Sequence, residues 1–135
     1  MHYTVQPLQQ GYANQILSIN VTTGKMEVLP LPPEVRNFFI GGRGLGLYLL
    51  HEQVTSRTKA SDPENPLIFS PGPLGGIPQF PGTSKCMAIS LSPLTGIPGV
   101  SNFGGHFGAY LKYAGFDALT AVSYTHLTLP TIYSV

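Results

Sequence analysis

The sequence predicts one mixed α+β domain, in which short β-strands and packed helices are joined by long loops rich in glycine and proline. Three observations predict it. Some short runs alternate apolar and polar residues, which is the period of a strand, and other runs repeat apolar residues every three or four positions, which is the period of a helix. The third observation is composition, because 16 glycines and 13 prolines among 135 residues exceed average usage without a collagen-like period.

Two strands are expected near the N-terminus. Residues 15–21 alternate in a way that predicts a half-buried strand, with one face made of Leu17, Ile19 and Val21. Gly24 provides a turn, and residues 26–29 alternate again. The spacing therefore predicts a β-hairpin.

Two helices follow the hairpin. The first is predicted over residues 32–41, where it begins at proline and Glu34 and stops at Gly41. Its expected apolar face consists of Val35, Phe38 and Phe39. Residues 43–54 are apolar on nearly all sides, which indicates a buried helix.

The second half of the chain predicts two further strands and a third helix. The strands are residues 67–69 and 86–92, and between them residues 70–82 form a long loop with four prolines. A loop of that length without elements of its own is often functional. The last helix begins near residue 107 and ends before Gly115. Its apolar stripe consists of Phe107, Tyr110, Leu111 and Ala114.

Composition limits the classes of function. Seven Lys and Arg against six Asp and Glu provide no basic surface for nucleic acid. The single cysteine, Cys86, excludes an internal disulfide or multi-thiolate metal site, and we expect it to be a small buried apolar residue. The four histidines have no metal-like spacing, and of these only His106 is of interest. No signal peptide or membrane-spanning run is evident, so a cytoplasmic chain without a membrane partner is expected.

Residues 40–46, "IGGRGLG", approach two nucleotide-binding motifs and satisfy neither. The G-x-G-x-x-G motif needs a glycine, and the P-loop needs a lysine, at the position that Leu47 occupies. We interpret this segment as a junction between two helices that requires glycine backbone.

Residues 101–108, "SNFGGHFG", place an asparagine and three glycines directly before the third predicted helix. A helix N-terminus carries free N–H groups and a partial positive charge, and glycines allow a phosphate to approach them. Asn102 could cap the helix through its side chain, or its side-chain carbonyl could bind Mg²⁺. An anion site with a bridging metal and an ordinary capped helix both stay open.

Five segments resemble, in this order, the N-terminal domain of the aldehyde ferredoxin oxidoreductase family. They are "GYANQILSINVTTGKMEV", "FFIGGRGLGLYLL", "SDPENPLIFSPGPLGG", "SLSPLTG" and "SNFGGHFGAYLKYAGFDAL". The resemblance runs from about Gly11 to Thr120. It implies that residues 1–121 are a partial pterin-binding domain of an enzyme with a tungsten, or molybdenum, bis-pyranopterin cofactor.

The resemblance implies cofactor-binding roles for four residues. Lys85 stands where the family usually has an arginine that meets a pterin phosphate, and lysine keeps the charge but loses the bidentate fork. Asn102 matches the family asparagine whose carbonyl oxygen binds the Mg²⁺ between the two pterin phosphates. Phe103 and Gly104 would offer backbone groups to the same pterin, although a small residue is common at the position of Phe103. No catalytic residue is expected in this chain.

The family oxidises an aldehyde with water to a carboxylic acid, and passes two electrons through a [4Fe–4S] cluster to ferredoxin. The cysteine ligands of the cluster come from later domains, and Cys86 alone cannot replace them. The resemblance therefore implies one part of an oxidoreductase, inactive by itself, whose partners are ferredoxin and an aldehyde. The choice between tungsten and molybdenum, the particular aldehyde and the formation of a homo-oligomer stay open.

Residues 122–135, "VSYTHLTLPTIYSV", have no counterpart in the family. Back-translated, the first ten of them match a transposase-type sequencing-library adapter. We therefore expect this tail to be adapter read-through on a truncated gene fragment, and assign no function to Tyr124 or His126. A genuine strand-rich tail is the alternative. Two other functions also stay open for the chain: a stand-alone cofactor or anion carrier without redox chemistry, and an inactive fragment.

Overall fold

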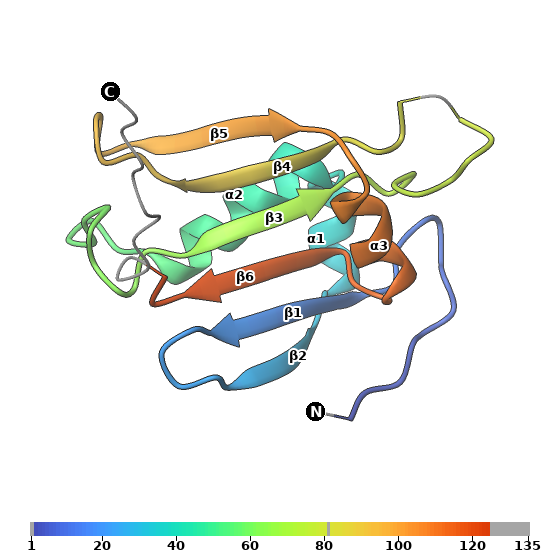
Figure 1. Ribbon diagram of the computed structural model, residues 1–135, viewed down its shortest axis with the longest axis horizontal. Coiled ribbons are helices and arrows are strands. Elements are labelled where there is room, and N and C mark those ends of the chain that lie inside the picture. The colour runs from blue at the N-terminus through green and yellow to red at the C-terminus, as the bar shows by residue number, and fades with distance from the viewer. Residues whose placement is uncertain (1, 81, 125–135) are drawn as a thin grey trace, which may run out of the picture.

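The computed structural model describes residues 2–80 and 82–124 (Figure 1). Within these residues six strands form one mixed sheet in the order β2-β1-β6-β3-β4-β5. The strands are β1 (Gln15–Asn20), β2 (Met26–Pro30), β3 (Leu67–Pro71), β4 (Cys86–Leu91), β5 (Pro98–Phe103) and β6 (Ala118–Val122). The helices are α1 (Pro33–Phe38), α2 (Gly42–Gln53) and α3 (Phe107–Tyr113). The predicted α+β class is confirmed.

The last strand holds the two parts of the sheet together. β6 pairs in parallel with β1, where Leu119 lies opposite Leu17, and antiparallel with β3, where Leu119 lies opposite Phe69. The predicted hairpin of β1 and β2 is confirmed on one side of β6, and β3, β4 and β5 form an antiparallel ribbon on the other. Val122, the first residue of the expected foreign tail, is the final residue of β6 and lies opposite Asn20.

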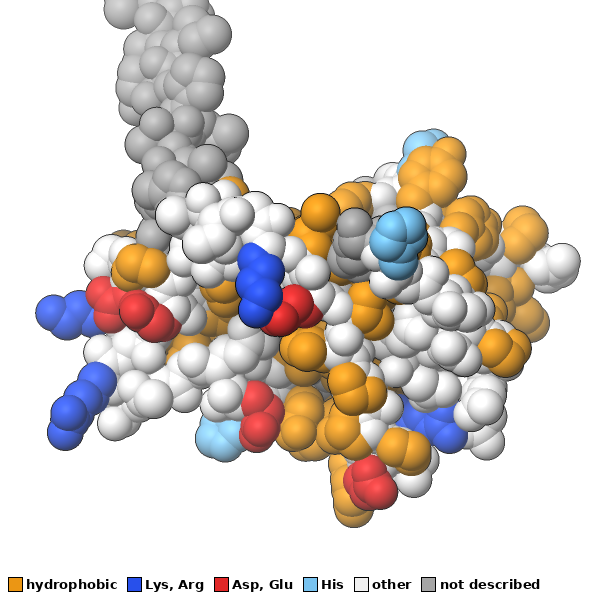
Figure 2. All heavy atoms as spheres, turned by 90° about the horizontal axis from the view of Figure 1, so that it is seen from below, with side chains coloured by type: hydrophobic (Ala, Val, Ile, Leu, Met, Phe, Trp, Pro, Cys, Tyr) orange, Lys and Arg blue, Asp and Glu red, His pale blue; other side chains and the backbone are white. Residues whose placement is uncertain are grey.

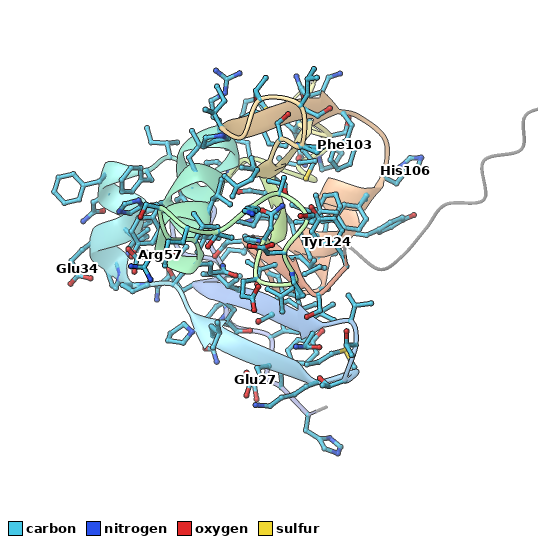
Figure 3. The ribbon with its side chains drawn as sticks, turned by 90° about the vertical axis from the view of Figure 1, so that its left-hand side faces the viewer. Glu27, Glu34, Arg57, Phe103, His106 and Tyr124 are labelled. Atoms are coloured by element: carbon cyan, nitrogen blue, oxygen red, sulfur yellow. The ribbon has the colours of Figure 1, made fainter. Side chains whose placement is uncertain are left out.

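The two faces of the sheet are covered differently (Figures 1 and 3). α1 and α2 lie on one face and enclose the main core. Gly46 of α2 lies directly against Ile89 of β4, so the helix can approach the sheet closely. The fully buried apolar side chains at this interface include Leu45, Leu50, Ile68 and Ile89.

The opposite face is also apolar, but α3 covers only one end of it. There Phe69, Phe103 and Phe107 pack together, with ring centroids 5.2–6.1 Å apart. Residues that lie opposite one another in the ladders share a face. By this register the rest of the face is lined by half-buried apolar residues, namely Leu17, Ile19, Val28, Leu67, Ala88, Leu119 and Ala121.

Three predicted apolar faces differ from the structure. In β1 the buried position is Ile16, whereas Leu17 and Ile19 lie on the open face. In α1 only Val35 is buried, and 81% of Phe38 is exposed. In the stripe of α3 Leu111 is buried, whereas 43% of Phe107 and 64% of Tyr110 are exposed. Periodicity indicates which side chains share a face, but it does not indicate whether anything covers that face.

A buried ion pair joins the N-terminal segment to the C-terminal part of the sheet. Lys112 Nζ lies 2.5 Å from Asp117 Oδ1, and both side chains are almost fully buried. The lysine also donates to the carbonyl oxygen of Gly11 at 2.6 Å. The two carboxylate oxygens accept the backbone N–H groups of Ala13, at 3.0 Å, and Asn14, at 2.6 Å. Each charge therefore has its counter-charge and further hydrogen bonds to the backbone, which a buried pair requires.

Few charged side chains interrupt the surface. Figure 2 shows hydrophobic side chains at many places on one face of the molecule, with lysine, arginine, aspartate and glutamate scattered among polar ones. Among the described residues no helix combines the length and the apolar character that are needed to cross a bilayer.

Candidate functional site

The candidate site lies at the end of the sheet where β4 begins and β5 ends. In that ladder Cys86 lies opposite Phe103 and Met87 lies opposite Asn102. Lys85, directly before β4, therefore reaches Gly104, directly after β5. A Cβ atom built on Gly104 would lie 3.6 Å from Lys85 Nζ. Strand pairing thus brings together three of the four predicted site residues, which are separated by up to 19 positions in the sequence.

Asn102 belongs to a strand and not to a helix start, contrary to one prediction. It lies in β5, exposed to solvent, whereas α3 begins only at Phe107 with His106 as its cap residue. His106 makes no side-chain capping bond and points away from the body of the protein (Figure 3). The interpretation of Asn102 as a helix cap is therefore wrong. Its amide is left exposed beside Met87.

Phe103 is separated from the other three side chains. Neighbouring positions of a strand point to opposite faces of the sheet, so Phe103 faces α3 and packs against Phe69 and Phe107. Asn102 lies on the opposite face of the sheet, which is the face that α2 covers. Only backbone groups of Phe103 are placed to act with Lys85 and Asn102, which is the kind of contact that the sequence predicts for it.

A pocket of about 630 Å³ lies beside Lys85, which is the predicted site residue in its lining. Its walls come from the start of α2, the end of β3, the start of β4 and the long loop between β3 and β4. Its lining includes Ile40, Gly42, Ser70, Pro73, Leu74, Phe80, Lys85 and Met87. The lining is mostly apolar with few polar groups, as is usual for the site of an organic ligand. Lys85 contributes a cation to it.

Close backbone contacts hold the loop that forms one wall. A Cβ atom on Gly76, whose φ is +80°, would come within 2.9 Å of the Tyr113 ring. The Tyr113 hydroxyl donates to the Gly76 carbonyl oxygen at 2.5 Å, which ties the loop to α3. Within the loop, Thr83 Oγ1 donates to the carbonyl oxygen of Ile77 at 2.9 Å. On the other side, Gly11 and Gly41 allow the chain to pass against Pro73. The predicted functional loop is therefore anchored at its base.

Cys86 lies beneath the site and is inert. Burial raises the pKa of its thiol to about 11, and its exposed fraction is 1%. A protonated, buried thiol is neither a nucleophile nor a metal ligand at neutral pH. The prediction of a small buried residue is confirmed. Among the described residues no three His, Cys, Asp or Glu side chains are grouped closely enough to hold a metal ion.

Sequence reasoning missed two parts of the site. Gly42 lines the pocket, although "IGGRGLG" is interpreted above as a helix junction alone. Ser70 also lines it: the sequence places residue 70 in the loop 70–82, whereas the structure places it in β3, and nothing in the sequence distinguishes this serine. Of the expected foreign tail, Tyr124 places its hydroxyl 2.8 Å from Ser90 Oγ, at the end of the sheet remote from the site, whereas His126 lies outside the described residues.

Comparison with known proteins identifies the family. The family model for the N-terminal domain of aldehyde ferredoxin oxidoreductase matches residues 16–122. The tungsten-containing aldehyde ferredoxin oxidoreductases of Pyrococcus abyssi and Pyrococcus furiosus are 40% and 37% identical over 109 residues. An aliphatic sulfonate oxidoreductase subunit of Pyrococcus furiosus is 35% identical over 113 residues. Each match covers 81% of this chain, which spans 18% of the length of those relatives.

A solved structure shares the fold. The active-site complex BamBC of benzoyl coenzyme A reductase, solved with 1,5-dienoyl-CoA, superposes with a TM-score of 0.79 and 28% identity, over 84% of this chain and 17% of that one. The family model covers most of the sequence, from the first strand to the last. The chain therefore belongs to the aldehyde ferredoxin oxidoreductase family, of which it carries the N-terminal domain.

Proposed function

We propose that residues 1–121 form part of the cradle for a tungsten pyranopterin cofactor in an enzyme that oxidises aldehydes to carboxylic acids with ferredoxin as electron acceptor. The observation that carries the proposal is the convergence of Lys85, Asn102 and Gly104 at one end of the β4–β5 pair. The tungsten-containing relatives support the choice of metal.

The three residues fit a phosphate and its metal ion. Lys85 is exposed and supplies a positive charge at the rim of the pocket. Asn102 is exposed and offers an amide oxygen, a ligand that Mg²⁺ accepts. Gly104 leaves free the space beside Lys85 Nζ that a side chain would fill. A cation, a hard oxygen ligand and open backbone therefore meet at one place.

Each residue has a distinct role in this proposal. Lys85 would neutralise a phosphate as a point charge, because its ammonium cannot form the two parallel hydrogen bonds of an arginine. Asn102 would bind the Mg²⁺ that joins the two pterin phosphates. Gly104 and the backbone of Phe103 would contact the same pterin, while the ring of Phe103 holds the strand end against α3.

The bound cofactor would supply the redox chemistry, and this chain would bind and orient it. The [4Fe–4S] cluster would depend on cysteines elsewhere in a full-length enzyme, because Cys86 is buried and protonated. The relatives are more than five times longer than the matched segment, which leaves room for the cluster, the substrate pocket and the surface that meets ferredoxin. By itself the chain would be inactive.

The choice of substrate depends on residues outside this domain. The matching proteins are named as oxidoreductases for aldehydes and for aliphatic sulfonates, and as a reductase for benzoyl coenzyme A. One N-terminal domain thus accompanies several reactions. Aldehyde oxidation is proposed here because the relatives with the higher identities are named for it.

A domain exchange tests the proposed function. Residues 16–122 of this chain would replace the matching segment of the Pyrococcus abyssi enzyme, and tungsten content, pterin content and aldehyde-dependent reduction of ferredoxin would be measured. We expect the chimera to retain all three, and Asn102→Ala to lower the cofactor content. The matched control is Asn37→Ala, at an exposed position of α1. A folded chimera that lacks pterin would contradict the proposal, whereas one that retains pterin without oxidising aldehydes would favour a cofactor carrier.

A further inference from the structure

The N-terminus of α2 lies at the pocket, and no acidic side chain in its first turn neutralises the partial positive charge of this helix end. The helix is 12 residues long, and its cap residue, Gly41, makes no side-chain capping bond. Its first turn contains no acidic residue and carries Arg43. The N–H groups of Gly42, Arg43 and Gly44 have no acceptor within the helix, and the helix dipole adds a partial positive charge.

A second observation at the same place comes from β3. Ser70 lines the same pocket as Gly42 and is fully buried. Among the residues that the structure describes, its hydroxyl oxygen has no hydrogen-bond partner. A buried hydroxyl without a partner is costly, so it calls for an acceptor or donor that a ligand could provide. In the ladder Ser70 lies opposite Met87, which places it on the face toward α2.

The backbone at this helix end is accessible. Gly42 has a φ of +45°, and a Cβ atom built on it would meet only the Met87 side chain, at 3.9 Å. Glycine at this point therefore leaves the first N–H groups open to a bound group. Lys85 supplies a cation to the same pocket.

We propose that the first turn of α2, together with Ser70, binds an oxyanion in this pocket, separately from the phosphate position at Asn102 and Gly104. The source of the anion rests on the proposed function: it is either a cofactor phosphate or the carboxylate of the acid formed from the aldehyde. The apolar lining, which includes Ile40, Leu74 and Phe80, favours an anion attached to an organic body.

Titration of the full 135-residue chain, followed by amide NMR, tests this subsite. Inorganic phosphate is the probe in one arm and benzoate in the other. We expect saturable shifts of the Gly42, Arg43 and Gly44 amides in at least one arm. A preference for phosphate identifies the cofactor as the source, and a preference for benzoate identifies the carboxylate.

Two variants separate binding from folding. Ser70→Ala removes a hydroxyl that has no hydrogen-bond partner within residues 2–80 and 82–124, so it should weaken anion binding by about tenfold without lowering stability. Gly44→Asp adds a negative charge where a Cβ atom has only ordinary contacts, at 3.5 Å or more, and should weaken binding at least as much while favouring the helix. Thr22→Asp, in the exposed hairpin turn, is the control for net charge.

Three results would overturn the subsite. The first is the absence of saturable shifts at the α2 amides in both arms. The second is a set of shifts confined to residues 102–105, which would leave the proposed function intact. The third is binding at α2 that neither Ser70→Ala nor Gly44→Asp weakens relative to Thr22→Asp.

Discussion

Lys85 Nζ lies 3.6 Å from the position that the Cβ atom of a side chain at Gly104 would occupy. The pair joins the start of one strand to the end of its neighbour. The space that a side chain at Gly104 would fill therefore lies directly beside the Lys85 ammonium. Whatever occupies that space meets a cation and bare backbone together.

Filling this space should reduce anion binding. We expect the added methyl groups of Gly104→Val to occupy the space beside the Lys85 ammonium and to weaken the binding of phosphate in the presence of Mg²⁺ by about tenfold, the loss of one charge-assisted contact. Gly99→Val, at the other end of β5, is the matched control, because a Cβ atom there has similarly ordinary contacts, but with Ser90 and Ser92 and not with a cation. Calorimetric titration measures both. Equal affinities for the two variants would show that Gly104 has no part in the site.

The buried ion pair should be essential for stability. Asp117→Asn leaves Lys112 buried without its counter-charge, and we expect the free energy of unfolding to fall by about 3–5 kcal/mol. Glu27→Gln breaks the exposed pair of Lys25 and Glu27, and should cost less than about 1 kcal/mol. Urea unfolding at neutral pH provides both values. Similar small losses would indicate that the Lys112–Asp117 pair contributes little net stability.

The Cys86 thiol should make stability fall at high pH. The unfolded thiol loses its proton near pH 9, whereas burial holds the folded thiol protonated to about pH 11. The unfolded state therefore binds fewer protons in this range, and stability falls as pH rises from 9 to 11, by at most about 2–3 kcal/mol. Burial and Asp117 raise the pKa of Tyr12 as well, which adds to the fall.

The contribution of the thiol is the difference in the free energy of unfolding between the unsubstituted chain and Cys86→Ala, because both proteins retain Tyr12. Unfolding in urea at a series of pH values measures it. We expect the two stability curves to diverge between pH 9 and 11. Parallel curves, or alkylation of folded Cys86 at neutral pH as fast as in urea, would show that the thiol is not buried and protonated.

The contact between α2 and β4 leaves no room for a methyl group. A Cβ atom on Gly46 would overlap Ile89 Cδ1, so we expect Gly46→Ala to destabilise the protein by about 1–3 kcal/mol despite its better helix propensity. Ile89→Val removes that methyl group and should cost about 0.5–1.5 kcal/mol alone. The double variant should be more stable than the sum of the two losses predicts. Additive losses would contradict this packing.

Much of the fold could be predicted from local patterns. The hairpin at residues 15–30 and the α2 helix follow from periodicity and from turn residues. β5 could not be predicted, because Pro98, Gly99, Ser101 and Asn102 are poor strand formers, and pairing with β4 overrides that preference. The exposure of Phe38 also follows from tertiary structure, since periodicity does not indicate what covers a helix.

The candidate site was predictable only in part. Family resemblance indicated Lys85 and Asn102, but their proximity depends on the register in which Met87 lies opposite Asn102. The glycines before α3 suggested a helix-capping role for Asn102 that the strand excludes. Ser70 had no signal, because its buried and unpartnered hydroxyl is a property of the folded chain.

In the proposed site Lys85, Asn102 and Gly104 hold a pterin phosphate through Mg²⁺. Pterins fluoresce, so the most direct measurement is the binding of a pterin monophosphate to the 135-residue chain, with and without Mg²⁺, followed by fluorescence. We expect saturable, Mg²⁺-dependent binding that Asn102→Ala and Lys85→Met each weaken by about tenfold or more, while Asn37→Ala does not. Binding by the folded chain that ignores both Mg²⁺ and these two substitutions, or no binding at all, would contradict it.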